Sequence, residues 1–113
     1  MDDAKLVRAL RALADPKRFR MVQAVAVAGE LSCGQIGERF PLSQPTVSHH
    51  LKILVAAGIF IARPEGQHHY LSVNREVLAE LVRDLPGRLA PPARRGRRAQ
   101  RSLPRSTTLA TLK

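Results

Sequence analysis

The side chains whose types and spacing suggest chemistry are concentrated in residues 44–52. A helix over this stretch carries small or hydrogen-bonding groups on its outward side and first turn, where an ordinary solvated face mixes Glu and Lys: Gln44, Thr46, Ser48, His49 and Lys52. A helix that enters the major groove of DNA needs short polar groups near its N-terminus, because they let the backbone approach the base edges. Gln pairs with adenine, Thr contacts a thymine methyl group, and Ser and His reach bases or phosphates.

Side chains suited to catalysis or metal binding do not gather in the sequence. Cys33 and the histidines lie on separate motifs, and the neighbouring residues His68 and His69 would face opposite sides of a strand, so they cannot chelate together. The sequence has no glycine-rich phosphate loop and no clustered carboxylate pair. We therefore expect neither an enzyme nor a bound cofactor or metal.

Cys33 allows two interpretations. A lone cysteine at such a place is most often a small buried apolar residue. Alternatively, a helix N-terminus lowers the pKa of the thiol and makes it a redox or electrophile sensor. Because the chain has no second cysteine, an intramolecular disulfide switch is excluded.

Periodicity and capping residues predict the element order α-α-α-α-β-β-α. Asp15, Ser32, Ser43 and Asn74 each stand where a helix would begin. The second helix would turn an apolar side made of Phe19, Val22, Val25 and Ala26 toward the core. The expected elements are helices over 4–14, 16–28, 33–40 and 44–57, strands over 59–63 and 69–73 about a Pro-Glu-Gly-Gln turn, and a helix over 75–89.

Two short helices joined by a tight turn at residues 41–43 and followed by a hairpin are typical of a winged helix-turn-helix. The fold class is therefore mainly α with a small β-hairpin. On the hairpin, Arg63 and His68 would contact a phosphate or the minor groove. A plain solvent-exposed hairpin is the alternative.

The distribution of charge divides the chain. Its 19 Lys and Arg against 9 Asp and Glu give a formal charge of +10. Residues 1–90 hold twelve of the basic and all nine acidic residues, which gives +3, and the seven basic residues of 91–113 supply the other +7. We therefore expect a DNA-binding and dimerisation domain over 1–90 and a basic, disordered tail over 91–113, which has too few apolar residues to bury.

The composition also indicates the partners and the cellular location of the protein. A basic excess favours a polyanionic partner. No apolar run approaches the ~20 residues that cross a bilayer, and the acidic start Met-Asp-Asp-Ala-Lys is unlike a signal peptide, so we expect a cytoplasmic protein with no membrane partner. Since a domain of ~90 residues has a small core, association of two chains is a natural way to enlarge it.

Three stretches resemble the ArsR/SmtB family of bacterial repressors. They are the run from Ala12 to Arg20, the run from Ser43 to Leu54, and Ala57-Gly58-Ile59 with Glu65-Gly66-Gln67. The resemblance covers residues 4–85 and implies a homodimer, paired through the first and last helices, that binds double-stranded DNA at a palindromic operator. Residues 91–113 have no counterpart in that pattern.

The family's metal-ligand positions differ in this chain. Where some members have a Cys-x-Cys pair at the start of the third helix, this sequence has Ser32 and Gly34, with Cys33 between them. Where others have histidines on the last helix, residues 75–90 contain none. The resemblance is therefore to the metal-independent members, which include small autorepressors.

Two other function classes stay open at this level: a dimeric protein-interaction module that keeps the fold, and a non-specific basic nucleic-acid binder. The second depends on the tail, which we expect to add affinity without specificity. Deleting residues 91–113 removes seven positive charges and should weaken binding to all DNA sequences alike. The slope of log K against log salt should become shallower by about 0.9 for each lost phosphate contact. Titration of specific and scrambled duplexes measures this; a changed operator preference after truncation would contradict it.

Overall fold

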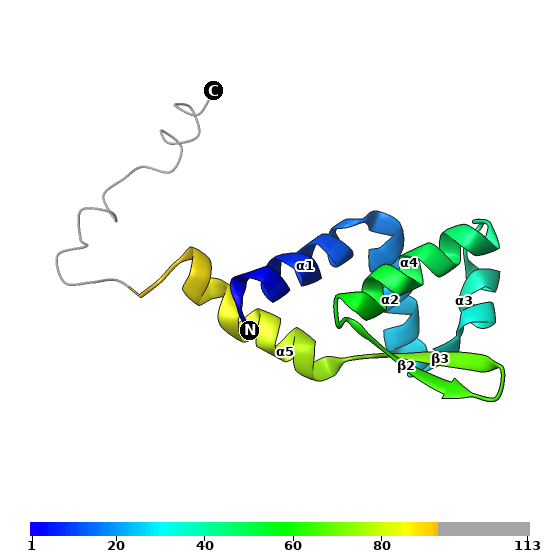
Figure 1. The fold of residues 1–113 in the computed structure, drawn as a ribbon. Helices are drawn as coiled ribbons and strands as arrows, with labels where there is room; N and C mark the ends of the chain where they lie inside the picture. The colour runs from blue at the N-terminus through cyan, green and yellow to red at the C-terminus, as the bar shows by residue number, and fades with distance from the viewer. Residues whose placement is uncertain (93–113) are drawn as a thin grey trace, which may run out of the picture.

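The computed structural model describes residues 1–92 and confirms a mainly helical winged helix-turn-helix fold (Figure 1). The predicted tail at 91–113 lies almost wholly outside the described residues. The helices are α1 (Asp3–Ala14), α2 (Pro16–Ala28), α3 (Cys33–Arg39), α4 (Gln44–Ala56) and α5 (Arg75–Leu89). The strands are β1 (Leu31–Ser32), β2 (Phe60–Glu65) and β3 (His68–Val73).

The predicted helix caps are confirmed. The Asp15 carboxylate accepts from the backbone N–H groups of Lys17 and Arg18 at the start of α2. Ser32 and Gln35 form a reciprocal capping box at the start of α3. Ser43 accepts from the Thr46 N–H at the start of α4, and Asn74 from the Val77 N–H at the start of α5. Each cap satisfies a backbone donor that the first turn of a helix leaves without a partner.

The sheet differs from the prediction in two respects. A third strand, β1, adds to the hairpin: Leu31 pairs with Leu71 and Ser32 with Tyr70. Two residues are too short for a period-2 pattern, so the sequence carries no signal for it. The hairpin is also longer than expected, because Pro64 and Glu65 belong to β2 and the turn is Gly66-Gln67. Gly66 has a φ of +62°, which glycine adopts without strain.

The core is aliphatic apart from Met21 and Phe60, in line with the composition. Its largest fully buried side chains are Met21, Ile36, Leu54, Ile59 and Leu71. They come from α2, α3, α4, the residue before β2, and β3. The predicted inner side of α2 is partly wrong. Val22 and Val25 are buried, but Met21 takes the place given to Phe19, which is half exposed, and Ala26 faces solvent. The helix is rotated so that its more flexible Met side chain fills the core.

Helices α1 and α5 lie side by side at one end of the molecule (Figure 1). The N-terminal ammonium lies 2.8 Å from Asp84 Oδ2, and Arg88 Nε donates to Asp3 over 2.7 Å. This ammonium and Arg83 hold the pKa of the Asp84 carboxyl at about 2. None of the helices in residues 1–92 is both long and apolar enough to cross a membrane.

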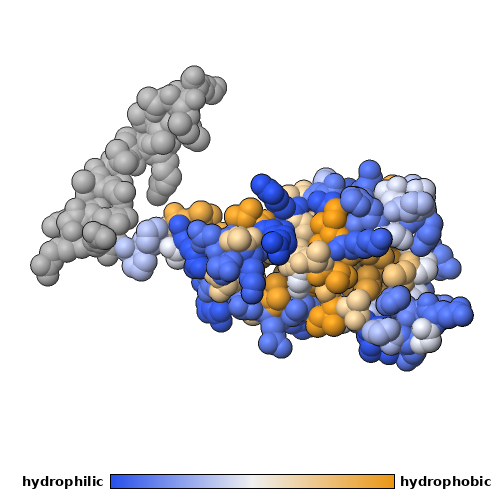
Figure 2. Space-filling view, in the orientation of Figure 1, coloured by the Kyte–Doolittle hydropathy of each residue, from blue (hydrophilic) through white to orange (hydrophobic). Residues whose placement is uncertain are grey.

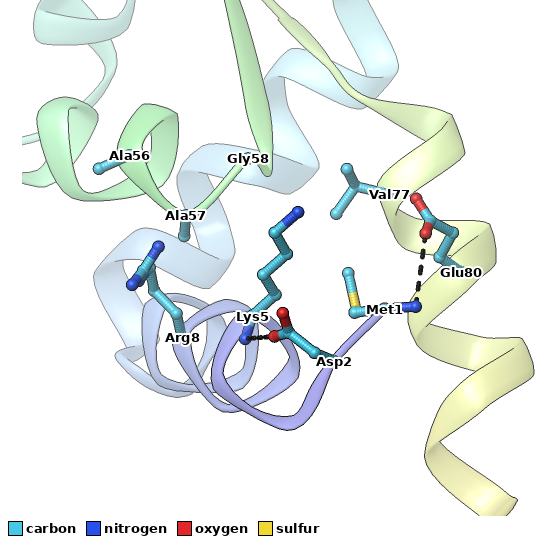
Figure 3. A pocket seen from close by; sticks show the side chains of 9 residues that line it. All are labelled: Met1, Asp2, Lys5, Arg8, Ala56, Ala57, Gly58, Val77 and Glu80. Atoms are coloured by element: carbon cyan, nitrogen blue, oxygen red, sulfur yellow. Dashed lines mark hydrogen bonds and ion pairs between the residues drawn. The ribbon is translucent and has the colours of Figure 1, made fainter.

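A pocket of about 420 Å³ separates α1 and α5 from the end of α4 (Figure 3). Lys5 and Arg8 of α1 and Glu80 of α5 extend around it, while Ala57 and Gly58 form its wall on the α4 side. Charges of both signs line this pocket, and it lies at the opposite end of α4 from the polar residues discussed below.

Candidate nucleic-acid interface

Helix α4 is anchored on one side and open on the other. Val47, Leu51 and Leu54 are buried against α1, α2, α3 and the sheet. A turn over residues 40–43 joins α3 to α4, with the N–H of Leu42 donating to the carbonyl of Phe40 over 2.8 Å. Pro45 stands in the first turn, where its missing N–H removes no helical hydrogen bond. The start of α4 is thereby held by packing and by its cap.

The polar residues predicted on α4 share its solvent-facing side. Gln44, Thr46, His49 and Lys52 are exposed and Ser48 is half-buried. The Thr46 hydroxyl lies 2.8 Å from the hydroxyl of the capping residue Ser43, which orients the Thr46 side chain. The Gln44 amide oxygen lies over Gly37, where a Cβ would approach it to 3.1 Å. The structure therefore brings five of the seven predicted side chains together.

The other two predicted residues lie on the hairpin, and one of them is already paired. Arg63 donates to both carboxylate oxygens of Glu30, over 2.9 and 3.1 Å, and to Glu65 over 2.9 Å. Its guanidinium also lies over the Tyr70 ring, 4.9 Å from the centroid. These bonds lower the pKa of Glu30 and raise that of Arg63. His68 is exposed beside the turn.

His50 is packed inside the domain. It is only 9% exposed, although it adjoins the exposed His49. Arg18 Nη1 lies 3.3 Å from His50 Nδ1. Because a guanidinium only donates, Nδ1 accepts and the ring is neutral. Burial lowers the pKa of His50, an effect that Asp15 partly opposes and Arg18 reinforces.

The arrangement matches known DNA-binding domains. Residues 13–61 match the model of a helix-turn-helix domain. The chain is 36% identical over 72 residues to the transcriptional repressor SdpR of Bacillus subtilis, which covers 64% of this chain and 79% of that protein. It is 32% identical over 85 residues to an arsenical resistance operon repressor of Staphylococcus aureus, which covers 75% of this chain and 81% of that protein.

The chain belongs to the ArsR/SmtB family of winged-helix regulators. Solved structures agree. HlyU from Vibrio cholerae is 32% identical, with a TM-score of 0.61 over 81% of this chain and all of that one. An ArsR-like regulator from a Rhodococcus species has the same fold at 20% identity, with a TM-score of 0.67 over 96% and 92% of the two chains. This ArsR/SmtB protein is a DNA-binding transcriptional repressor.

The two positions that hold a Cys-x-Cys pair in some family members carry no thiolate in this chain. The Ser32 hydroxyl accepts from Gln35 N–H in the capping box, and Gly34 has no side chain. Among residues 1–92, no three His, Cys, Asp or Glu side chains come together as ligands would. Cys33 is half-buried, and burial raises the pKa of its thiol. This direction is opposite to that of the activated thiol considered from the sequence.

The buried His50 predicts an acid-sensitive fold. Because its pKa is lowered from 6.5 in the folded state, the unfolded chain takes up a proton at higher pH, so stability is full above this value and falls as the pH drops through it. From about pH 7.5 to about pH 5.5 the melting temperature of the wild type should fall more than that of His50→Gln. The pKa of Asp15 is lowered from 3.8, so protonation of this carboxylate affects stability only at lower pH.

The exposed His49→Gln is the matched control for this measurement and should follow the wild type. Equal slopes of melting temperature against pH for the wild type and His50→Gln would contradict the assignment.

Proposed function

We propose that two copies of this repressor bind a palindromic operator, each placing α4 in the major groove. The observation that carries this proposal is the solvent-facing side of α4. It is made of short polar groups at the N-terminal end of a helix whose other side is buried. In this proposal Gln44, Thr46, Ser48 and His49 read base edges, and Lys52 contacts a phosphate.

The contacts that these side chains form in the free protein support the roles proposed for them. Gln44, His49 and Lys52 form no side-chain hydrogen bond or ion pair with another residue of 1–92, so binding DNA breaks no such contact. The Ser43–Thr46 pair occupies the Thr46 hydroxyl, which favours a contact between its methyl group and thymine.

The hairpin residues have different roles in this proposal. Arg63 can reach a phosphate only if it gives up Glu30 or Glu65, two carboxylates that it already contacts. We therefore assign the first hairpin contact to His68 at the turn, with Arg63 as a second contact that requires an exchange of partners. In the free protein, Arg63 ties the hairpin to the segment before β1.

Selection of bound duplexes from a random DNA pool tests the proposal directly. We expect a palindrome whose half-sites lie about one helical turn apart, roughly 10 base pairs from centre to centre. Recovery of unrelated sequences would favour the non-specific binder, and recovery of none would favour the protein-interaction module.

Apolar residues left uncovered on α1 and α5 support the dimer. Val82 is 72% exposed and Leu89 75%, and Val7 and Leu10 of the adjacent α1 are also exposed. Leu81, by contrast, is 8% exposed and belongs to the domain's own core. The dimer surface proposed here is therefore this exposed set, and a substitution of Leu81 would test the fold instead of the interface.

Val82→Arg should leave the domain folded and make it monomeric, because it places a charge on a surface that the partner would bury. Operator affinity should fall with it. Val27→Arg is the matched control: Val27 is 90% exposed on α2, away from this surface, and the variant should stay dimeric. Sedimentation at micromolar concentration measures the outcome. A monomeric wild type would overturn the proposal.

Specificity should depend on the first two turns of α4. Gln44→Ala and His49→Ala should each cost about 1–3 kcal/mol on the selected operator and little on scrambled DNA, because base-edge contacts exist only in the matched complex. Lys52→Ala should weaken both complexes alike, as loss of a phosphate contact does. Binding titrations on the two duplexes separate these effects; equal losses for Gln44→Ala on both would count against a base contact.

We also propose that DNA binding does not depend on metal, because Ser32 and Gly34 stand at the family's thiolate positions. Operator affinity should not change with zinc, cadmium, arsenite or a chelator. Release of the protein by micromolar metal, abolished in Cys33→Ser, would show that this proposal is wrong.

For the rest of the chain, we propose that residues 1–90 form the DNA-binding and dimerisation domain and that the seven basic residues of 91–113 add affinity without specificity. A repressor acts where the chromosome is, so we place the protein in the cytoplasm.

A further inference from the structure

A second cavity, of about 340 Å³, lies between α4 and the inner face of the hairpin. Its apolar walls include Leu51 and Val55 of α4 and Ala62 and Leu71 of the sheet. Leu51 and Leu71 are buried, whereas Val55 and Ala62 are exposed. In the space-filling view, hydrophobic surface is visible between α4 and the hairpin (Figure 2). The volume is within the range of small-molecule sites.

The cavity exists because β2 presents a small side chain to α4 at the inner-face position after Phe60. Alternate residues share one face of a strand, and here the cross-strand pairs on the inner face are Phe60 with Val73 and then Ala62 with Leu71. Phe60 is 2% exposed and fills its place in the core. Ala62 is too short to reach α4, so the cavity between α4 and the hairpin stays open.

Basic and polar groups surround this apolar cavity. Lys52 and His69 line it with Ser48, and no acidic residue does. Lys52 and His69 form no ion pair with any of the residues in 1–92. The outer face of the same hairpin is different, because Arg63 there is neutralised by Glu30 and Glu65. The cavity is thus complementary to an apolar molecule that carries a negative charge.

We propose that this cavity binds a small molecule with an apolar body and one carboxylate, and that binding weakens the repressor's hold on DNA. The body would lie on Leu51 and Leu71, and the carboxylate would accept from Lys52 and His69. The second half of the proposal rests on the proposed function, in which Ser48 and Lys52 contact DNA. An occupied cavity neutralises Lys52 and holds the hairpin away from α4.

Cys33 also lines the cavity, and it is the only cysteine in the chain, so its alkylation reports occupancy without DNA. The probe is octanoate, with 1-octanol and octylamine as controls for charge. A bound octanoate should shield Cys33 from the alkylating reagent. Octanoate at about four times its dissociation constant should therefore slow alkylation of the full-length protein about fivefold. The protection should saturate. Octanol should protect less at equal concentration, and octylamine least.

Variants of the cavity make the labelling test specific. Ala62→Leu fills the cavity and should abolish the protection of Cys33. Ala62→Ser keeps the cavity open and should retain the protection. Lys52→Met keeps the apolar stem but removes the charge, and should raise the half-protecting octanoate concentration about fivefold. Lys17→Met, on α2, is its control and should not change that concentration. Thermal melts show that each variant is folded.

Absence of protection at millimolar octanoate, or equal protection by octylamine, would overturn the site. The regulatory half is measured separately, on the selected operator. Octanoate should lower the affinity of Ala62→Ser about fivefold when about four-fifths of the sites are occupied, and should leave that of Ala62→Leu unchanged. Protection of Cys33 with no change in operator affinity would overturn the coupling to DNA while leaving the site in place.

Discussion

Arg18 joins three helices and adds a polar contact to the packing that holds α4 in place. Its guanidinium donates to the carbonyls of Arg11 and Ala12 at the end of α1 and to Nδ1 of His50 on α4. Its own backbone N–H is held by the Asp15 cap at the start of α2. The last carbonyls of a helix have no partners within it, so one side chain satisfies two of them and contacts α4 at the same time. The Asp-Pro-Lys-Arg run thus does more than begin a helix.

A small aliphatic core explains the rest of the architecture. The buried residues come from every element, but α5, the longest helix, contributes only Leu81 to them. Val82 and Leu89 on the same helix are left exposed. Within one chain these two side chains of α5 therefore stay uncovered. A second copy, related by a twofold axis, would bring an identical surface to them. Two α4 helices related by such an axis would suit a palindromic site.

The sequence predicted those features that depend on local chemistry. Asp15, Ser32, Ser43 and Asn74 cap the helices as expected, because a cap involves only residues two or three positions apart. The exposed set on α4 followed from helical periodicity for the same reason. The features that sequence reasoning missed depend on contacts between distant segments. Strand β1 exists through its pairing with β3, and the rotation of α2 is decided by core packing.

Arg63 shows how such a distant contact changes a functional assignment. In sequence, a basic residue on a hairpin is a natural phosphate ligand, and nothing nearby marks Glu30 as its partner, 33 positions away. The antiparallel sheet brings Arg63 beside Tyr70, and the Tyr70 ring supports the guanidinium that Glu30 and Glu65 engage. On the outer face, two carboxylates thereby neutralise the charge of Arg63, while on the inner side Lys52 and His69 line an apolar cavity that no acidic residue lines. Two faces of one hairpin therefore have different chemistry: the outer one fixes the hairpin to the domain, and the inner one is available to an anionic partner.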